Sequence, residues 1–224
     1  MTQARVLIAA AVLLGVLYIT GAVALGTPPE VSDSPASIAA WFLDHRDAAR
    51  LYAWTAAFGT VAVAIIAAII RGLLPAPHRD IFLLGAAAFI IETAVQAWFW
   101  AGMALDPSSL TSSTVRLGFN VLSLWGPILT GATMAMIGSV TALGLRSDPL
   151  IPRWLTVLGV IAFAEQAIET ITVFGTSGFA APGGGMNLQL GAGITLIWIA
   201  GLVVWAAREL GAPAQGAEQA ASAG

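Results

Sequence analysis

Three glutamates, Glu92, Glu165 and Glu169, lie inside long apolar runs of this 224-residue chain. An acidic side chain at the centre of a membrane helix costs at least about 2.5 kcal/mol, so residues of this kind face the helix bundle and are candidates for function. A protonated glutamic acid beside an ionised one forms an acid–base pair. We therefore expect all three glutamates to be catalytic.

Polar and aromatic residues recur beside these glutamates in steps of three and four, which places them on shared helix faces. We expect them to surround one polar cavity between the third, fourth and fifth apolar runs. If Arg116 reaches Glu169, it holds this carboxyl group ionised and leaves Glu92 or Glu165 as the proton donor. The expected substrate-binding residues are Phe89, Gln96, Trp100, Arg116, Asn120, Ser123, Trp125 and Phe163.

The composition excludes a water-soluble protein. Apolar residues make up 58% of the chain and charged residues only 9%, against about 25% charged in an ordinary soluble domain. The absence of cysteine excludes disulfides, thiol catalysis and cysteine-based metal sites. No metal-binding or phosphate-binding motif is present, so we expect no metal and no cofactor. No basic patch indicates nucleic acid as a partner.

Six apolar runs are long enough to cross a membrane, which takes about 20 residues in a helix. Because every backbone polar group must be bonded within such a segment, the runs must be helices. The predicted fold is an all-α, integral membrane six-helix bundle, with residues 1–210 as one domain. In the fourth run Pro127 can kink the helix. The predicted spans are 6–25, 51–74, 81–105, 114–145, 154–174 and 188–207.

Arginine placement predicts the orientation of these spans. All nine basic residues are arginine, and with the amino terminus inside, six lie on the cytoplasmic side and three on the other. Both termini are therefore expected in the cytoplasm. Arginine without lysine, together with abundant alanine and glycine, is typical of a GC-rich bacterium, so the expected location is a bacterial cytoplasmic (inner) membrane. The six are Arg5, Arg71, Arg79, Arg146, Arg153 and Arg208, and the three are Arg46, Arg50 and Arg116.

Four further segments complete the predicted organisation. Ser34 and Pro35 are typical of a helix start and predict an interfacial helix at 35–44. The glycine-rich loop 175–187 is interpreted as a connector, with a mobile lid as the alternative. Residues 211–224 are predicted to be a disordered tail. The first span is interpreted as a retained helix, although a cleaved secretory signal is the alternative.

Two segments resemble a group of small six-span bacterial membrane proteins classed as a domain of unknown function. They are SIAAWFLDHR at 37–46 and ALGLRSDPLIPRWLTVLG at 142–159, and the likeness extends over about residues 34–163. The resemblance implies the six-span topology and carries no established activity. In proteins of this group the middle of the fifth span is usually apolar, so Glu165 and Glu169 depart from the pattern.

The glutamates favour a cofactor-independent acid–base enzyme, a cyclase or isomerase acting on a lipophilic isoprenoid- or polyene-like substrate. The integral-membrane terpene cyclases provide an analogy in chemistry, not in sequence. Two alternatives stay open: a structural subunit of a membrane complex, in which the glutamates fasten helices together, and a small proton-coupled transporter. The expected partners are the lipophilic substrate and membrane lipid, and a homodimer is left open.

Overall fold

The computed structural model describes residues 2–211, and this part of the chain is all-helical, without a strand. The all-α fold class is therefore confirmed. Six helical segments within these residues are long and apolar enough to cross a membrane. They occupy the positions of the six predicted spans: Gln3–Leu25, Arg46–Arg71, His78–Leu105, Ser112–Gly144, Arg153–Phe174 and Met186–Gly211.

The spans are helices that are apolar on nearly every side. Large apolar side chains cover the outside of the bundle, among them Val12, Leu84, Trp98 and Phe174. A helix that is apolar all round belongs either in a large protein core or in a membrane. Because this apolar surface is exposed on a small bundle, the six helices indicate a multi-pass membrane protein.

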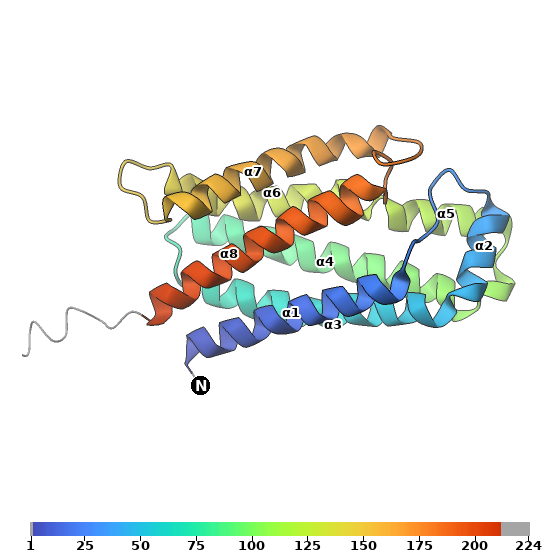
Figure 1. Ribbon diagram of the computed structural model, residues 1–224, viewed down its shortest axis with the longest axis horizontal. Helices are drawn as coiled ribbons and strands as arrows, with labels where there is room; N and C mark the ends of the chain where they lie inside the picture. The colour runs from blue at the N-terminus through green and yellow to red at the C-terminus, as the bar shows by residue number, and fades with distance from the viewer. Residues whose placement is uncertain (1, 212–224) are drawn as a thin grey trace, which may run out of the picture.

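The spans form a ring in which each one packs against the next (Figure 1). In order around the ring they are α1 (Gln3–Leu25), α3 (Arg46–Arg71), α4 (His78–Leu105), α6 (Trp125–Gly144), α7 (Arg153–Glu169) and α8 (Ala192–Gly211). Helix α8 packs against α1 and closes the ring. Because neighbours in the ring follow one another along the chain, short connections suffice.

The short helix α2 (Pro35–Asp44) covers one end of the bundle (Figure 1). It forms at the predicted residues, and Ser34 Oγ caps it by accepting a hydrogen bond from Ser37 N at 3.1 Å. The two ends of the described chain lie at the opposite end of the bundle. We call these two ends of the molecule the α2 end and the terminal end. Of the tail predicted at 211–224, residues from 212 onward lie outside the described part of the chain.

The fourth span is two helices, α5 (Ser112–Ser123) and α6, interrupted at Leu124. Pro127 lies in the first turn of α6 and has no backbone N–H to donate to the residue four positions earlier. The interruption therefore falls where the sequence predicts a kink. It allows α5 to pack against α2 while α6 continues down the bundle.

The last two spans are joined by irregular structure. Helix α7 ends in a 3₁₀ turn, Thr170–Phe174, and α8 is preceded by a π-helical turn, Met186–Gly191. The loop between them turns at Gly178 and Gly183, whose φ angles of 71° and 70° favour glycine. Turns of the π type are frequent at functional sites, and this one lies beside Glu169.

Two apolar cores fill the ring. The core at the terminal end is built around Trp198, Phe82 and Leu155. The core at the α2 end contains Phe42, Trp100 and Phe119. The candidate site lies between these cores.

Candidate functional site

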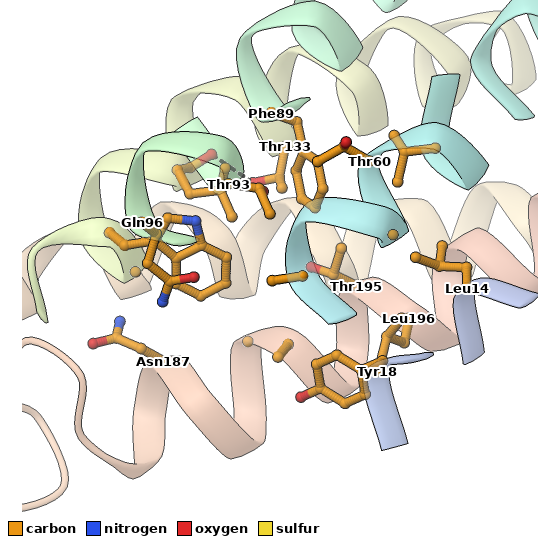
Figure 2. Close-up of a pocket in the computed structure, with 18 of the residues that line it drawn as sticks. Leu14, Tyr18, Thr60, Phe89, Thr93, Gln96, Thr133, Asn187, Thr195 and Leu196 are labelled. Atoms are coloured by element: carbon orange, nitrogen blue, oxygen red, sulfur yellow. Dashed lines mark hydrogen bonds between the residues drawn. The ribbon is translucent and has the colours of Figure 1, made fainter. Parts of the chain in front are cut away.

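A cavity of about 110 Å³ lies in the middle of the ring, and all six spans contribute to its wall. Figure 2 shows Phe89, Thr93 and Gln96 on one side of the cavity, opposite Tyr18 and Asn187 on the other. The wall is mostly apolar toward the terminal end and carries most of its polar groups toward the α2 end. The apolar part contains Leu14, Val63, Phe89, Leu196 and Ile199, and the polar part Tyr18, Tyr52, Gln96, Trp125, Gln166, Glu169 and Asn187.

Glu169 lines this cavity and is almost completely buried. Its Oε1 accepts a hydrogen bond from Asn187 Nδ2 at 2.7 Å, and its Oε2 accepts one from Gln166 Nε2 at 2.7 Å. Asn187 is fixed in turn, because its Oδ1 accepts from Gly183 N at 2.9 Å and its Nδ2 donates to Thr172 Oγ1 at 3.1 Å. Hydrogen bonds of this kind compensate a buried carboxyl group for its lost water.

Gln166 joins two of the predicted glutamates. Its Nε2 donates to Glu165 Oε2 at 2.8 Å as well as to Glu169 Oε2, while its Oε1 accepts from the hydroxyl of Thr133 on α6. The structure therefore brings Glu165 and Glu169 together through one amide group. Glu165 is buried, although it is not part of the cavity wall.

Two glycines allow this close packing. A Cβ at Gly191 would lie 2.0 Å from Glu169 Oε2, and a Cβ at Gly126 would lie 2.5 Å from Asn187 Cγ. With Glu169 and Asn187 in these positions only glycine fits, because a larger residue would force their side chains to move. The sequence thus provides space for the carboxyl and amide groups on the two elements that face them, α6 and the π-helical turn.

Glu92 lies apart from this network. It is half-buried on α4 outside the cavity wall, and its Oε2 is buried without a hydrogen-bond partner among residues 2–211. It follows Gly85 by two helical turns, and Gly85 packs against Ala132 of α6, so both residues share the α6 side of α4. The sequence predicts that three glutamates lie together, and the structure brings two of them together, Glu165 and Glu169.

Three of the predicted substrate-binding residues, Phe89, Gln96 and Trp125, line the cavity. The aromatic ring of Trp100 belongs instead to the core at the α2 end. Asn120 is exposed on α5 and Phe163 is 41% exposed on α7, so neither side chain is enclosed in the bundle.

Arg116 and Ser123 contact neighbouring loops and do not line the cavity. Arg116 donates to the backbone carbonyls of Val31, at 2.7 Å, and of Asp33, and not to Glu169. The arginine thus ties α5 to the loop before α2. Ser123 is buried beside the glycine-rich loop, with its Cβ 3.4 Å from the Cβ position of Gly183.

Sequence reasoning missed Tyr18, Tyr52, Gln166 and Asn187. The two tyrosines are the only ones in the chain, and both line the cavity. Their hydroxyls donate to Leu188 O and to Gln96 Oε1, each at 3.4 Å. A polar-tipped aromatic residue within an apolar span is a signal that could have identified them. Asn187 immediately precedes the predicted sixth span and is the first polar residue after the glycine-rich segment.

The chain matches no protein-family model, no curated protein and no solved structure. The resemblance of segments 37–46 and 142–159 to six-span bacterial proteins therefore stays a prediction. The function has to be inferred from the chemistry of the cavity itself.

Proposed function

We propose that this protein is a membrane-embedded acid–base enzyme that isomerises or cyclises a lipophilic, isoprenoid- or polyene-like substrate without a cofactor. The observation that carries the proposal is the Glu169 carboxyl group in the wall of an otherwise largely apolar cavity inside the bundle. A cavity with apolar walls and a few convergent polar groups is the usual form of a small-molecule site.

The proposal includes a place for the protein in the cell. The terminal end of the bundle contains Arg5, Arg79 and Arg208, whereas the α2 end contains Arg46 and Arg116. Of the nine arginines, six lie near the terminal end, which by the positive-inside rule is the cytoplasmic end. We therefore place both termini in the cytoplasm and the α2 end outside a bacterial inner membrane.

Glu169 supplies the proton in the proposed reaction. Its protonated carboxyl group transfers a proton to one carbon of a substrate double bond, and the electron pair of that bond forms the new C–H bond. The other carbon becomes a cation. In an isomerisation, a proton lost from a carbon next to the cation returns to the Glu169 carboxylate. In a cyclisation, a second double bond first attacks the cation and closes the ring.

Aromatic side chains support a cationic intermediate. Tyr18, Tyr52, Phe89 and Trp125 line the cavity from four different helices, α1, α3, α4 and α6. The face of an aromatic ring attracts a nearby positive charge by about 0.5–2 kcal/mol. Glu165, joined to Glu169 through Gln166, is a second carboxyl group beside the acid.

The test compares Glu169→Gln with Glu92→Gln in protein reconstituted in lipid nanodiscs. Linear polyprenyl and polyene substrates are supplied in D₂O, and products are identified by gas chromatography and mass spectrometry. The wild type should form an isomer that carries deuterium from the solvent. Loss of a general acid lowers the rate about 100-fold or more, so Glu169→Gln should do this, whereas Glu92→Gln should stay within about threefold because it lies outside the cavity. Equal turnover by wild type and Glu169→Gln would refute the proposed acid.

The hydrogen bonds of Glu169 also favour a second candidate, a structural role in a membrane complex. They join α7 to the π-helical turn and, through Gln166 and Thr133, to α6. In this case Glu169→Gln lowers the amount of folded protein or of recovered complex, and the wild type forms no isomer from any polyene. The two candidates therefore differ in the behaviour of the wild type.

A further inference from the structure

Two hydrogen-bond donors in the cavity wall have no partner within residues 2–211. They are the hydroxyl of Thr93 on α4 and the indole N–H of Trp125 on α6. Both atoms are buried, and Thr93 as a whole is only 8% exposed. A buried donor without an acceptor costs about 1–3 kcal/mol, so such groups are usually satisfied by something.

The Thr93 hydroxyl differs from the hydroxyls of Thr55, Thr60 and Thr133, which also line the cavity. A helical threonine commonly bonds the backbone carbonyl one turn earlier. Thr55 does so to Tyr52 O at 2.9 Å and Thr60 to Ala57 O at 2.6 Å, while the Thr133 hydroxyl donates to Gln166 Oε1. The Thr93 hydroxyl makes no such bond within the described residues, which leaves its proton for an acceptor in the cavity.

The indole N–H of Trp125 restricts which chemical groups can be the partner in the cavity. An indole N–H can donate but cannot accept, so its partner must offer a lone pair. Helices α4 and α6 pack side by side, and Thr93 and Gln96 lie one turn apart on the wall that α4 contributes (Figure 2). The two unpartnered donors thus come from adjacent helices and line the same cavity.

We propose that Thr93 Oγ1 and Trp125 Nε1 form a binding site for an oxygen atom of the substrate. The substrate is then an oxygenated lipophilic molecule, with a carbonyl, ether or epoxide oxygen, and not a pure hydrocarbon. Its apolar part begins at the end of the cavity lined by Leu14, Phe89 and Ile199 and extends out of it, because the cavity volume of about 110 Å³ is below the roughly 300 Å³ of the smallest usual ligand pockets. This inference rests on the proposed function, because it assigns the substrate class of the same cavity.

The experiment uses two probes, the linear isoprenoid ketone geranylacetone and the hydrocarbon farnesene. Binding to the full-length protein in nanodiscs is followed by tryptophan fluorescence, and the carbonyl group of the ketone by isotope-edited infrared spectroscopy. A net hydrogen bond changes binding by about two- to tenfold. We expect the ketone to bind more tightly than the hydrocarbon by this factor, with its carbonyl stretch at lower frequency than in lipid alone.

Variants of Thr93 and Trp125 test whether these two residues donate the hydrogen bond to the ketone oxygen. Thr93→Val keeps the shape of the side chain and removes the hydroxyl, so ketone binding should weaken about two- to tenfold while hydrocarbon binding stays the same. Thr93→Ser should restore ketone binding, and a Thr93→Val/Trp125→Phe double variant should return the carbonyl frequency to its value in lipid. Thr130→Val is the matched control, because the Thr130 hydroxyl already donates to Pro127 O at 2.7 Å and lies outside the cavity wall.

Equal binding of both probes, or an unshifted carbonyl frequency in the wild type, overturns the oxygen site. This failure is distinct from failure of the proposed function. If the wild type isomerises a hydrocarbon but does not shift the carbonyl, only the oxygen site is wrong. If the carbonyl shifts in a manner that depends on Thr93, but no isomer forms from any substrate, only the catalytic proposal is wrong.

Discussion

Glu169 and Glu92 are the same residue type within apolar spans, yet their surroundings are opposite. Both carboxyl oxygens of Glu169 accept hydrogen bonds from side-chain amides. On Glu92 one carboxyl oxygen is buried without a partner among residues 2–211. The difference shows that an acidic residue in a span can be a built part of a site or an unpaired group outside it, and that its partners decide which.

The contrast has an energetic basis. A buried polar group is expensive unless hydrogen bonds replace its water, and the cost of removing a partner exceeds the gain from making the bond. Glu169 therefore depends on Asn187 and Gln166, and they depend on it. Glu92 has no such mutual dependence with any described residue.

The largest expected effect comes from replacing each glutamate by leucine. Glu169→Leu leaves the amides of Asn187 and Gln166 without their acceptor, which should destabilise the protein by about 2–4 kcal/mol. Glu92→Leu removes an unpartnered carboxyl group and should be neutral or stabilising. Thermal unfolding in detergent, followed by circular dichroism, measures both. Similar losses for the two variants would break the contrast between the glutamates.

The next largest effect tests the space around Glu169. Gly191→Ala places a Cβ against Glu169 Oε2, so the carboxyl group must move away from Asn187 or Gln166. We expect a loss of about 1–3 kcal/mol. Gly193→Ala is the control, because a Cβ at Gly193 meets nothing within 4 Å in the described structure, and alanine in a helix gains up to about 1 kcal/mol over glycine. Urea or heat unfolding of the two variants should move in opposite directions.

A smaller effect is expected for Thr133, which is linked to the Glu169 carboxyl group only through the hydrogen bonds of Gln166. Thr133→Val removes the hydroxyl that donates to Gln166 Oε1, at a cost of about 1 kcal/mol. Thr141→Val, elsewhere on α6, removes a buried hydroxyl that has no partner within residues 2–211, and its cost should be below about 0.5 kcal/mol. Comparison of the two melting temperatures checks this order, and a greater loss for Thr141→Val would contradict it.

The smallest effect concerns Asp106, an exposed carboxylate after the end of α4. It serves as a water-exposed comparison for the glutamates within the spans. Hydrogen bonds from Ser108, at 2.7 Å, and from Ser109 hold the pKa of Asp106 below its usual range. These bonds stabilise the charged form, so Ser108→Ala should raise the pKa toward the usual value. The stabilisation by the ionised group is present above the usual pKa and is lost as pH falls through the lowered one. Carbon-13 NMR titration of labelled aspartate measures the shift, and an unchanged pKa would show that Ser108 has no influence.

Much of the fold follows from local sequence signals. Long apolar runs predict the spans, Ser34 and Pro35 predict the start of α2, and Pro127 predicts an interruption near Leu124. These features depend on residues within a few turns of one another, so they can be read without knowing which helices touch.

The candidate site was less predictable because it depends on contacts between distant segments. Helical spacing placed Glu165 and Glu169 on one face of α7, and the structure shows them joined through Gln166. The spacing left open whether Arg116 reaches Glu169, and in the structure the arginine bonds to the backbone before α2. Helical periodicity predicts which residues share one face of a helix, but not which residues of other elements that face contacts.

The sequence by itself determined the apolar helices and the presence of glutamates within them, since both follow from residue type and local spacing. Only the tertiary structure decided that Tyr18 and Tyr52 share a cavity with Glu169 and that Asn187 and Gln166 hold its carboxyl group. The physical reason is helix packing. Glycines at 126 and 191 leave room for large polar groups where two elements touch, and the residue pattern of one helix does not specify which groups of another element occupy that room.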